Sequence, residues 1–285
     1  MTIKASDVKN LREKTGLGMM ECKRALEEAS GDIDLAITNL RKNSALKAEK
    51  KSSRTAVEGI VLTKNNQSSN NSIILEVNCE TDFVAKDENF INFTQDVLDV
   101  CFNSPQKSLE DLLSESLEEK RQSLVQKIGE NIVVRRKANI LEGYVSEYIH
   151  GNNKIGVIVS LKNENEELGK DIAMHIAASS PLVVNPEDVD VDLLSKEREI
   201  ISAQVSGSDK PKEIIEKMVS GRLDKFLSEV SLINQLFVKD PSEKISSLLS
   251  KSNNKVISFV RFEVGEGIEV EKKDFAKEVQ EQLNS

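Results

Sequence analysis

The chain has 285 residues, enough for about two domains that each bury a core of their own. Hydrophobic residues make up 38% of the chain and charged residues 31%, which is typical of a folded protein with a charged surface and excludes a disordered one. The net charge of −9 argues against a protein that coats nucleic acid, since phosphate binding requires a surplus of lysine and arginine.

The first predicted unit is a bundle of three helices over residues 1–42. Val8 and Leu11 lie on one face of the first helix, which Gly16 and Gly18 then end. Two more helices follow, and the apolar residues in them recur at spacings near 3.6, which indicates one buried face on each. These residues are Met19, Cys22, Leu26 and Ala29 in the second helix, and Ile33, Ala36, Ile37 and Leu40 in the third.

A basic run, residues 41–54, follows the expected end of the third helix at Arg41. It contains a single acidic residue. We interpret the run as a solvated helix extension or a tether, and the alternative is a contact with an acidic partner or RNA. The RNA alternative predicts salt-dependent RNA binding that is lost when Lys47, Lys50 and Lys51 are neutralised.

Strand patterns begin after this run. Residues 59–77 indicate a hairpin, with two β-rich runs around the polar turn residues 65–72. Residues 142–161 repeat this plan, and an amphipathic helix follows each hairpin, at 89–101 and at 167–178. We therefore predict an internal duplication of a unit made of a strand, a turn, a strand and a helix.

A helix at 117–128 and a strand at 132–140 are expected between the two copies, with the strand joining the first copy. Further along, two apolar stripes flank the turn residues 207–211. Helices joined by so short a turn must run antiparallel, which predicts a protruding helical hairpin over about residues 190–228.

Residues 255–264 alternate in polarity like a strand, and residues 274–283 are expected to form a short terminal helix. The predicted fold class is therefore α+β, with four parts. They are a three-helix module with a basic linker at 1–54, a first core subdomain at 55–141, a second at 142–263 that carries the helical hairpin, and a C-terminal module at 264–285.

No arrangement of residues indicates catalysis. The two histidines, His150 and His175, lie in separate segments, and both the HExxH zinc motif and the phosphate-binding Walker loop are absent. Gly265 and Gly267 lack the third glycine of a dinucleotide fingerprint. We therefore expect no enzyme activity, no cofactor and no bound metal.

Cysteine usage and the N-terminal sequence predict a cytoplasmic protein. The three cysteines, Cys22, Cys79 and Cys101, have no CxxC spacing, which argues against a disulfide framework or a zinc site. Cys22 and Cys79 are interpreted as small buried residues. Residues 1–20 contain no apolar signal segment, and no stretch approaches the ~18 apolar residues of a membrane span.

Residues 78–86 are the strongest candidate for a binding surface. They place Glu80, Asp82 and Phe83 directly after a strand, where the connection to the next helix is expected to be exposed. Aromatic residues make up only 4% of the chain, so an exposed phenylalanine is informative. Phe83 is either a core residue whose neighbours cap a turn, or an apolar wedge beside a carboxylate that docks on another protein.

Five segments resemble the bacterial elongation factor Ts family, in the same order and across nearly the whole chain. They are residues 11–23 (LREKTGLGMMECK), 76–86 (EVNCETDFVAK), 174–179 (MHIAAS), 229–232 (EVSL) and 261–267 (RFEVGEG). The resemblance implies a guanine nucleotide exchange factor that binds elongation factor Tu in its GDP-bound and nucleotide-free forms. It also implies that the N-terminal module is similar to ubiquitin-associated domains.

The family's Asp-Phe pair, which inserts into the GTP-binding domain of elongation factor Tu, matches Asp82 and Phe83. Thr81 and Val84 complete the matching tip. In the family, this insertion displaces helices that support the magnesium and phosphate sites. A factor that prefers the nucleotide-free state must weaken GDP binding by the same coupling free energy.

Further contact positions of the family match residues in the N-terminal module. These are Arg12, Met19, Met20 and Lys23. Met19 also falls on the apolar stripe of its helix, so a core position remains an alternative for it. Met20 points off that stripe and is the better candidate for a contact.

Two more matches lie in the second half of the chain. His150 and Val238 match positions that the family uses against a second domain of elongation factor Tu. Lys239 departs from the pattern, because family members can carry a methionine there. His175 lies on a predicted helix among apolar neighbours, so we interpret it as a structural residue.

One more function remains as an alternative, besides the RNA binding considered for the basic run. Residues 1–42 could be a generic peptide- or ubiquitin-binding adaptor, in which case this fragment alone would retain binding. The hairpin at 190–228 is either a surface for self-association or partner binding, or it packs on its own core. Neither nucleic acid nor a membrane is expected as a partner.

Overall fold

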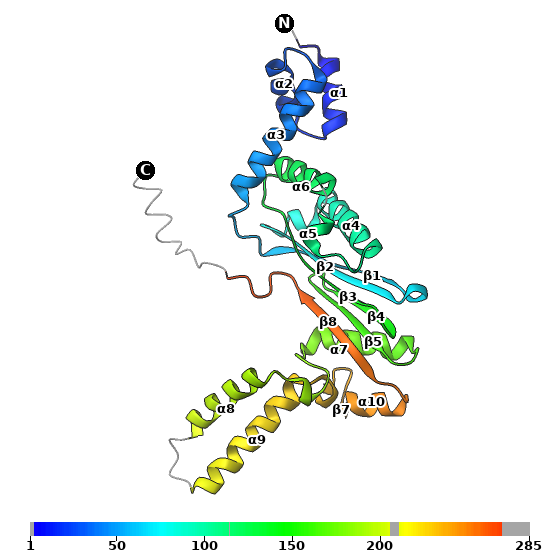
Figure 1. Ribbon diagram of the computed structural model, residues 1–285, viewed down its shortest axis with the longest axis vertical. Helices are drawn as coiled ribbons and strands as arrows, with labels where there is room; N and C mark the ends of the chain where they lie inside the picture. The colour runs from blue at the N-terminus through cyan, green and yellow to red at the C-terminus, as the bar shows by residue number, and fades with distance from the viewer. Residues whose placement is uncertain (1–2, 114, 206–210, 270–285) are drawn as a thin grey trace.

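The computed structural model describes residues 3–113, 115–205 and 211–269 and shows a mixed α and β protein (Figure 1). Three helices form its N-terminal module: α1 (Ala5–Thr15), α2 (Met19–Glu28) and α3 (Ile33–Lys51). They pack around apolar side chains that include the fully buried Leu11, Leu26 and Ala36. Gly16 ends α1 in the left-handed conformation, with φ at 69°, as a glycine after a helix commonly does.

The third helix continues well past its predicted end at Arg41. Beyond Leu40, which is buried in the module, it also buries Ser44 and Ala48 at four-residue spacing, and it packs against α6 (Glu115–Ile128). The Ser44 hydroxyl donates to the Leu40 carbonyl at 2.7 Å, so this buried polar group has a partner. The prediction of the helix end was wrong because a serine and an alanine do not continue an apolar stripe.

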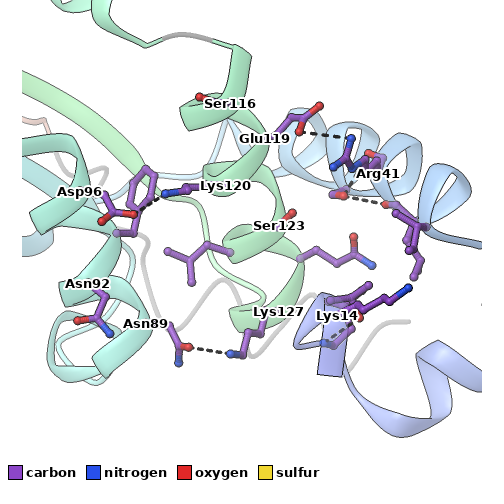
Figure 2. A pocket seen from close by; sticks show the side chains of 18 residues that line it. Lys14, Arg41, Asn89, Asn92, Asp96, Ser116, Glu119, Lys120, Ser123 and Lys127 are labelled. Carbon is purple, nitrogen blue, oxygen red and sulfur yellow. Dashed lines mark hydrogen bonds and ion pairs between the residues drawn. The ribbon is translucent and has the colours of Figure 1, made fainter. Parts of the chain in front are cut away.

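Most cations of the basic run bind partners inside the protein. Lys47 pairs with Glu21 at 2.6 Å, Arg41 with Glu119 at 3.6 Å and Arg54 with Glu80 at 3.6 Å, while Lys51 donates to the Gly129 carbonyl. Figure 2 shows the groove between α3, α6 and α4 (Glu88–Asn103), where Arg41 faces Glu119 and Lys120 faces Asp96. The run therefore holds the module against the rest of the chain, which favours the structural interpretation over RNA contact.

The first sheet is antiparallel, with the strand order β1-β2-β3. Its strands are β1 (Glu58–Asn66), β2 (Asn71–Cys79) and β3 (Val133–Ile140). The predicted turn at 65–72 is too long, because Asn65 pairs with Ser72 in the ladder between β1 and β2. The Asn65 side chain also donates to the Val145 carbonyl at 2.8 Å. Asn65 and Ser72 therefore belong to strands, and Asn65 has a partner in the second sheet.

The second sheet has the order β4-β5-β8 and is also antiparallel. Its strands are β4 (Tyr144–His150), β5 (Ile155–Leu161) and β8 (Val256–Glu263). Ile158 of β5 lies opposite Val260 of β8, although the two residues are far apart in the chain. Both predicted hairpins and the strand predicted at 255–264 are thus confirmed.

The two sheets pack against each other, and helices cover their outer faces (Figure 1). Val61, Ile74 and Ile158 lie in the apolar layer between them. Gly156 sits at a close approach of the sheets, where an added Cβ atom would clash with Val61. The helices are α4, α5 (Leu109–Leu112) and α6 on the first sheet, and α7 (Glu166–Ser179) and α10 (Ile245–Lys251) on the second.

Two further helices, α8 (Val191–Val205) and α9 (Lys212–Val230), pack on each other and extend away from the sheets (Figure 1). They bury Ile201, Val205 and Val219. The strands β6 (Leu236–Phe237) and β7 (Asp240–Lys244) follow. The predicted turn at 207–211, apart from Pro211, and the predicted helix at 274–283 lie outside the described residues. Within the described ranges, no helix combines the length and apolar character needed to cross a membrane.

A buried carboxylate, Glu76, joins the first sheet to the chain that follows β8. It accepts hydrogen bonds from Arg135 at 2.9 Å, from Arg136 at 2.5 Å and from the Gly265 N–H at 2.9 Å. Burial alone raises the pKa of a carboxyl, but these donors outweigh it and hold the pKa of Glu76 below its ordinary value. Gly265 has a φ of 77°, and an added Cβ would clash with the Val57 carbonyl, so only glycine fits this contact.

Candidate functional site

Residues 80–83 form a turn that projects directly after β2, and we call it the projecting turn. Phe83 is 80% exposed, more than any other large apolar residue in the described part of the chain. The interpretation of Phe83 as a core residue is therefore wrong. An aromatic ring left in water beside charged residues is typical of a surface that binds another molecule.

The residues that follow the turn anchor it. Val84 and Ala85 are buried and pack into the core of the first sheet and α4. The prediction that the Val84 side chain belongs to an exposed tip is wrong, because the short 3-10 helix Val84–Lys86 points this side chain inward. Within the predicted tip, Phe83 is exposed, and Thr81 and Asp82 are partly exposed.

Asp82 stands beside Phe83 as a charged carboxylate. Lys86, one helical turn further on, donates to it at 2.7 Å. This hydrogen bond lowers the pKa of Asp82. The turn therefore presents an anion next to an apolar ring at neutral pH.

A carboxylate from a distant part of the chain holds the projecting turn. Glu130 accepts the N–H groups of Glu80 and Thr81, each at 3.0 Å, and the Thr81 hydroxyl at 2.7 Å. The Cys79 thiol donates to the Thr81 carbonyl at 3.2 Å, and burial raises its pKa to about 12, so it stays protonated. Reasoning from the sequence missed Glu130, since no local pattern connects it to the turn.

A second surface lies on the N-terminal module. Met19 is 59% exposed and Met20 is 69% exposed, and they line a shallow cavity together with Arg12 and Lys23. The alternative that Met19 is a core residue is therefore wrong. Cys22, on the inner side of α2, is buried instead.

A third surface joins two residues that are far apart in the chain. His150, at the end of β4, and Val238, after β6, line the same depression of about 540 Å³. The Tyr148 hydroxyl contacts the His150 Nδ1 at 2.9 Å. Val238 is 45% exposed, so its side chain is available for an apolar contact.

His175 is a buried residue that contacts the segment carrying Val238. Its side chain is fully buried on α7, its Nδ1 accepts the Val238 N–H at 3.2 Å, and its Nε2 contacts the Gln235 Oε1 at 2.9 Å. Burial lowers the pKa of His175, so the imidazole is neutral. These contacts agree with the interpretation of His175 as a structural residue.

Comparison with known proteins identifies the family. A family model described as Elongation factor TS matches residues 80–266. An elongation factor Ts from Hahella chejuensis is 53% identical over 281 residues, which cover 99% of this chain and 98% of that protein. The chain belongs to the elongation factor Ts family.

Other members of the elongation factor Ts family match equally large parts of the chain. Proteins of this name from Marinobacter nauticus and Legionella pneumophila are 53% and 49% identical to it. The matched regions cover 96% and 99% of the lengths of these two proteins, respectively. Membership of the elongation factor Ts family assigns the chain a role in the elongation stage of protein biosynthesis.

The buried His175 leads to a prediction about stability and pH. The unfolded chain takes up a proton near pH 6.5, whereas the folded protein resists protonation at this position, so the unfolded state binds more protons as the pH falls. Stability is therefore expected to fall when the pH drops from 7.5 to about 5.5. His175→Gln should reduce this fall, as measured by urea unfolding at a series of pH values.

His150→Gln is the matched control for this experiment, because His150 is an exposed histidine on the same half of the protein. It measures the effect of removing a histidine from the surface, with which the effect of His175→Gln is compared. Equal pH dependence in wild type and His175→Gln would show that His175 does not carry the effect.

Proposed function

We propose that this chain is a guanine nucleotide exchange factor for elongation factor Tu, acting in the cytoplasm. The observation that carries the proposal is Phe83, an aromatic side chain that is 80% exposed on a turn held by buried anchors. The ring and the adjacent Asp82 carboxylate suit insertion between packed helices of the partner's GTP-binding domain. Membership of the elongation factor Ts family supports the same partner.

Nucleotide release in this proposal requires no covalent chemistry. A protein that binds nucleotide-free elongation factor Tu more tightly than the GDP-bound form weakens GDP binding by the same free energy. A coupling of about 2.7 kcal/mol corresponds to roughly a hundredfold change in GDP affinity. The projecting turn need only be complementary to the nucleotide-free form of its partner.

The other two surfaces supply affinity in this proposal. The N-terminal module, which we take to be similar to ubiquitin-associated domains, would hold the GTP-binding domain through Arg12, Met19, Met20 and Lys23. The depression at His150 and Val238 would contact a second domain. Contacts on both sides of the projecting turn would fix its approach to the nucleotide site.

The direct test is the release of a fluorescent GDP analogue from elongation factor Tu after excess unlabelled GDP is added. The wild-type chain should accelerate release at sub-stoichiometric concentrations, because it dissociates and acts again. An unchanged release rate over a wide range of concentrations would refute the proposed function.

Met20→Ala is expected to weaken binding to elongation factor Tu by roughly three- to tenfold, since burial of a methionine side chain contributes about 1 kcal/mol or more. The maximal release rate should stay near that of the wild type, because Met20 belongs to a different surface from the projecting turn. The dependence of the release rate on protein concentration separates the two quantities.

Leu46→Ala is the matched control for Met20→Ala. Leu46 is 55% exposed on α3 and belongs to none of the three proposed surfaces. If both variants weaken binding equally, the N-terminal surface is not specific to Met20.

Self-association through α8 and α9 stays a separate proposal. Val191 and Ile200 of α8 are 74% and 51% exposed, which supports an apolar contact there. Sedimentation equilibrium of the wild type and of Ile200→Asp tests it, since only a dimer through this face would dissociate in the variant.

A further inference from the structure

We propose that Glu130 is a positioning residue for nucleotide exchange, which fixes the projecting turn before the partner is met. The role rests on the proposed function of the turn. Both carboxylate oxygens of Glu130 are hydrogen-bonded to the turn itself. It acts through the backbone of residues 80–81 and the hydroxyl of Thr81.

One carboxylate satisfies three donors of the turn. Its Oε2 accepts two successive backbone N–H groups, from Glu80 and Thr81, and its Oε1 accepts the Thr81 hydroxyl. Hydrogen bonds to an ionised acceptor are about twice as strong as neutral ones. Glu130 therefore defines where the backbone leaves β2 and how it enters the turn.

Phe83 depends on this anchor because its own side chain packs against little. Because the ring is 80% exposed, contacts with a core do not fix its position. Its position is set by the backbone on either side, which Glu130 holds before the ring and the buried Val84 holds after it. A turn that is already ordered loses less conformational entropy on insertion than a mobile one.

The contact between the two segments is reciprocal. Glu80 accepts the Asn131 N–H at 2.6 Å, while Asn131 is buried and donates its side-chain amide to the Arg54 carbonyl at 2.8 Å. Arg54 follows α3, the helix that carries the N-terminal module. Glu130 and Asn131 therefore tie the projecting turn to the segment that follows α3, the last helix of the N-terminal module.

Glycine makes this junction possible. Gly129 ends α6 with a φ of 90°, a conformation that side chains disfavour, and turns the chain so that Glu130 faces the projecting turn. The Gly129 carbonyl accepts the amine of Lys51 at the end of α3. Residues 129–131 thus contact both the helix and the turn.

Two variants of Glu130 separate positioning from general stability. Glu130→Gln keeps the length of the side chain, and its amide oxygen can still accept the two N–H groups while its NH₂ donates to the Thr81 hydroxyl. Glu130→Ala removes all three bonds. We expect Glu130→Ala to lower the maximal GDP-release rate about tenfold or more, and Glu130→Gln to stay within about threefold of the wild type.

Hydrogen exchange of the Glu80 and Thr81 amides, followed by NMR in the free protein, measures positioning without the partner. Both amides should exchange at least about tenfold faster in Glu130→Ala than in the wild type. Glu110→Ala is the charge-matched control, because Glu110 is exposed on α5 and is not among the residues that bond to the turn. It should change neither the release rate nor the exchange of these amides.

The outcomes distinguish the two proposals. Wild-type release rates and wild-type amide exchange in Glu130→Ala would overturn the role of Glu130. Accelerated amide exchange in this variant, with a wild-type chain that releases no GDP, would instead refute the proposed function alone. If Glu130→Ala does not fold, Thr81→Val removes one donor from the same carboxylate, and an unchanged release rate in that variant overturns the role.

Discussion

Phe83→Ala is expected to lower the acceleration of GDP release from elongation factor Tu by about thirtyfold or more, because a buried aromatic anchor at an interface contributes at least about 2 kcal/mol. The free protein should lose no stability, since the ring is 80% exposed and the variant leaves no cavity. Release of fluorescent GDP gives the first quantity and thermal unfolding gives the second.

Leu182→Ala provides a control for the loss of an exposed apolar side chain. Leu182 is 58% exposed and lies in the connection after α7, outside the three proposed surfaces. It should leave both the release rate and the melting temperature unchanged. If Phe83→Ala accelerates release as fully as the wild type, Phe83 is not a wedge, even if the chain still exchanges nucleotide.

Glu76→Ala is expected to destabilise the fold by roughly 3–5 kcal/mol, because it leaves two arginines without their buried partner. Arg135 and Arg136 would lose their bonds to the carboxylate, and the N–H of Gly265 would lose its acceptor. The free energy of unfolding in urea measures the loss. Glu166→Ala, which breaks a fully exposed ion pair with Lys170, is the control and should leave the free energy of unfolding close to that of the wild type.

The pH dependence of the wild type gives a second readout for Glu76. Its folded pKa lies below the unfolded value of 4.5, so the unfolded state binds more protons as the pH falls through this window. The stability that Glu76 contributes is fully present above about pH 4.5 and is lost as the pH falls toward the folded pKa. Glu76→Gln should show a smaller loss between pH 5 and 3, and an unchanged slope would contradict the assignment.

Much of the fold could be predicted from periodicity. The β-rich runs of β1, β2 and β5 are local patterns of strands that are largely buried, and residues 255–264 showed the alternation expected of β8. The end of α3 could not be predicted in the same way. Ser44 and Ala48 are buried against α6, so the helix depends on a partner that is distant in sequence.

The candidate site was predictable only in part. The residue types alone allowed Phe83 to be either buried or exposed, because the sequence of a short segment between a strand and a helix does not show which way a ring points. Val84 was likewise assigned to the exposed tip together with Phe83. Successive side chains on a turn point in different directions, and that of Val84 points into the core. Contacts that span the topology, such as Glu130 with Thr81 or His150 beside Val238, leave no trace in local spacing.

The pairing of β5 with β8 has a consequence for the order of events during synthesis. The two strands are separated by about a hundred residues, including all of α8 and α9, so β5 is made long before its second neighbour. Because a chain is synthesised at about 5–20 residues per second, one edge of β5 stays unpaired for on the order of 5–20 seconds before β8 is made. The second half of the nascent chain is therefore the half most exposed to mispairing, while the N-terminal helices, built from local contacts, are already folded.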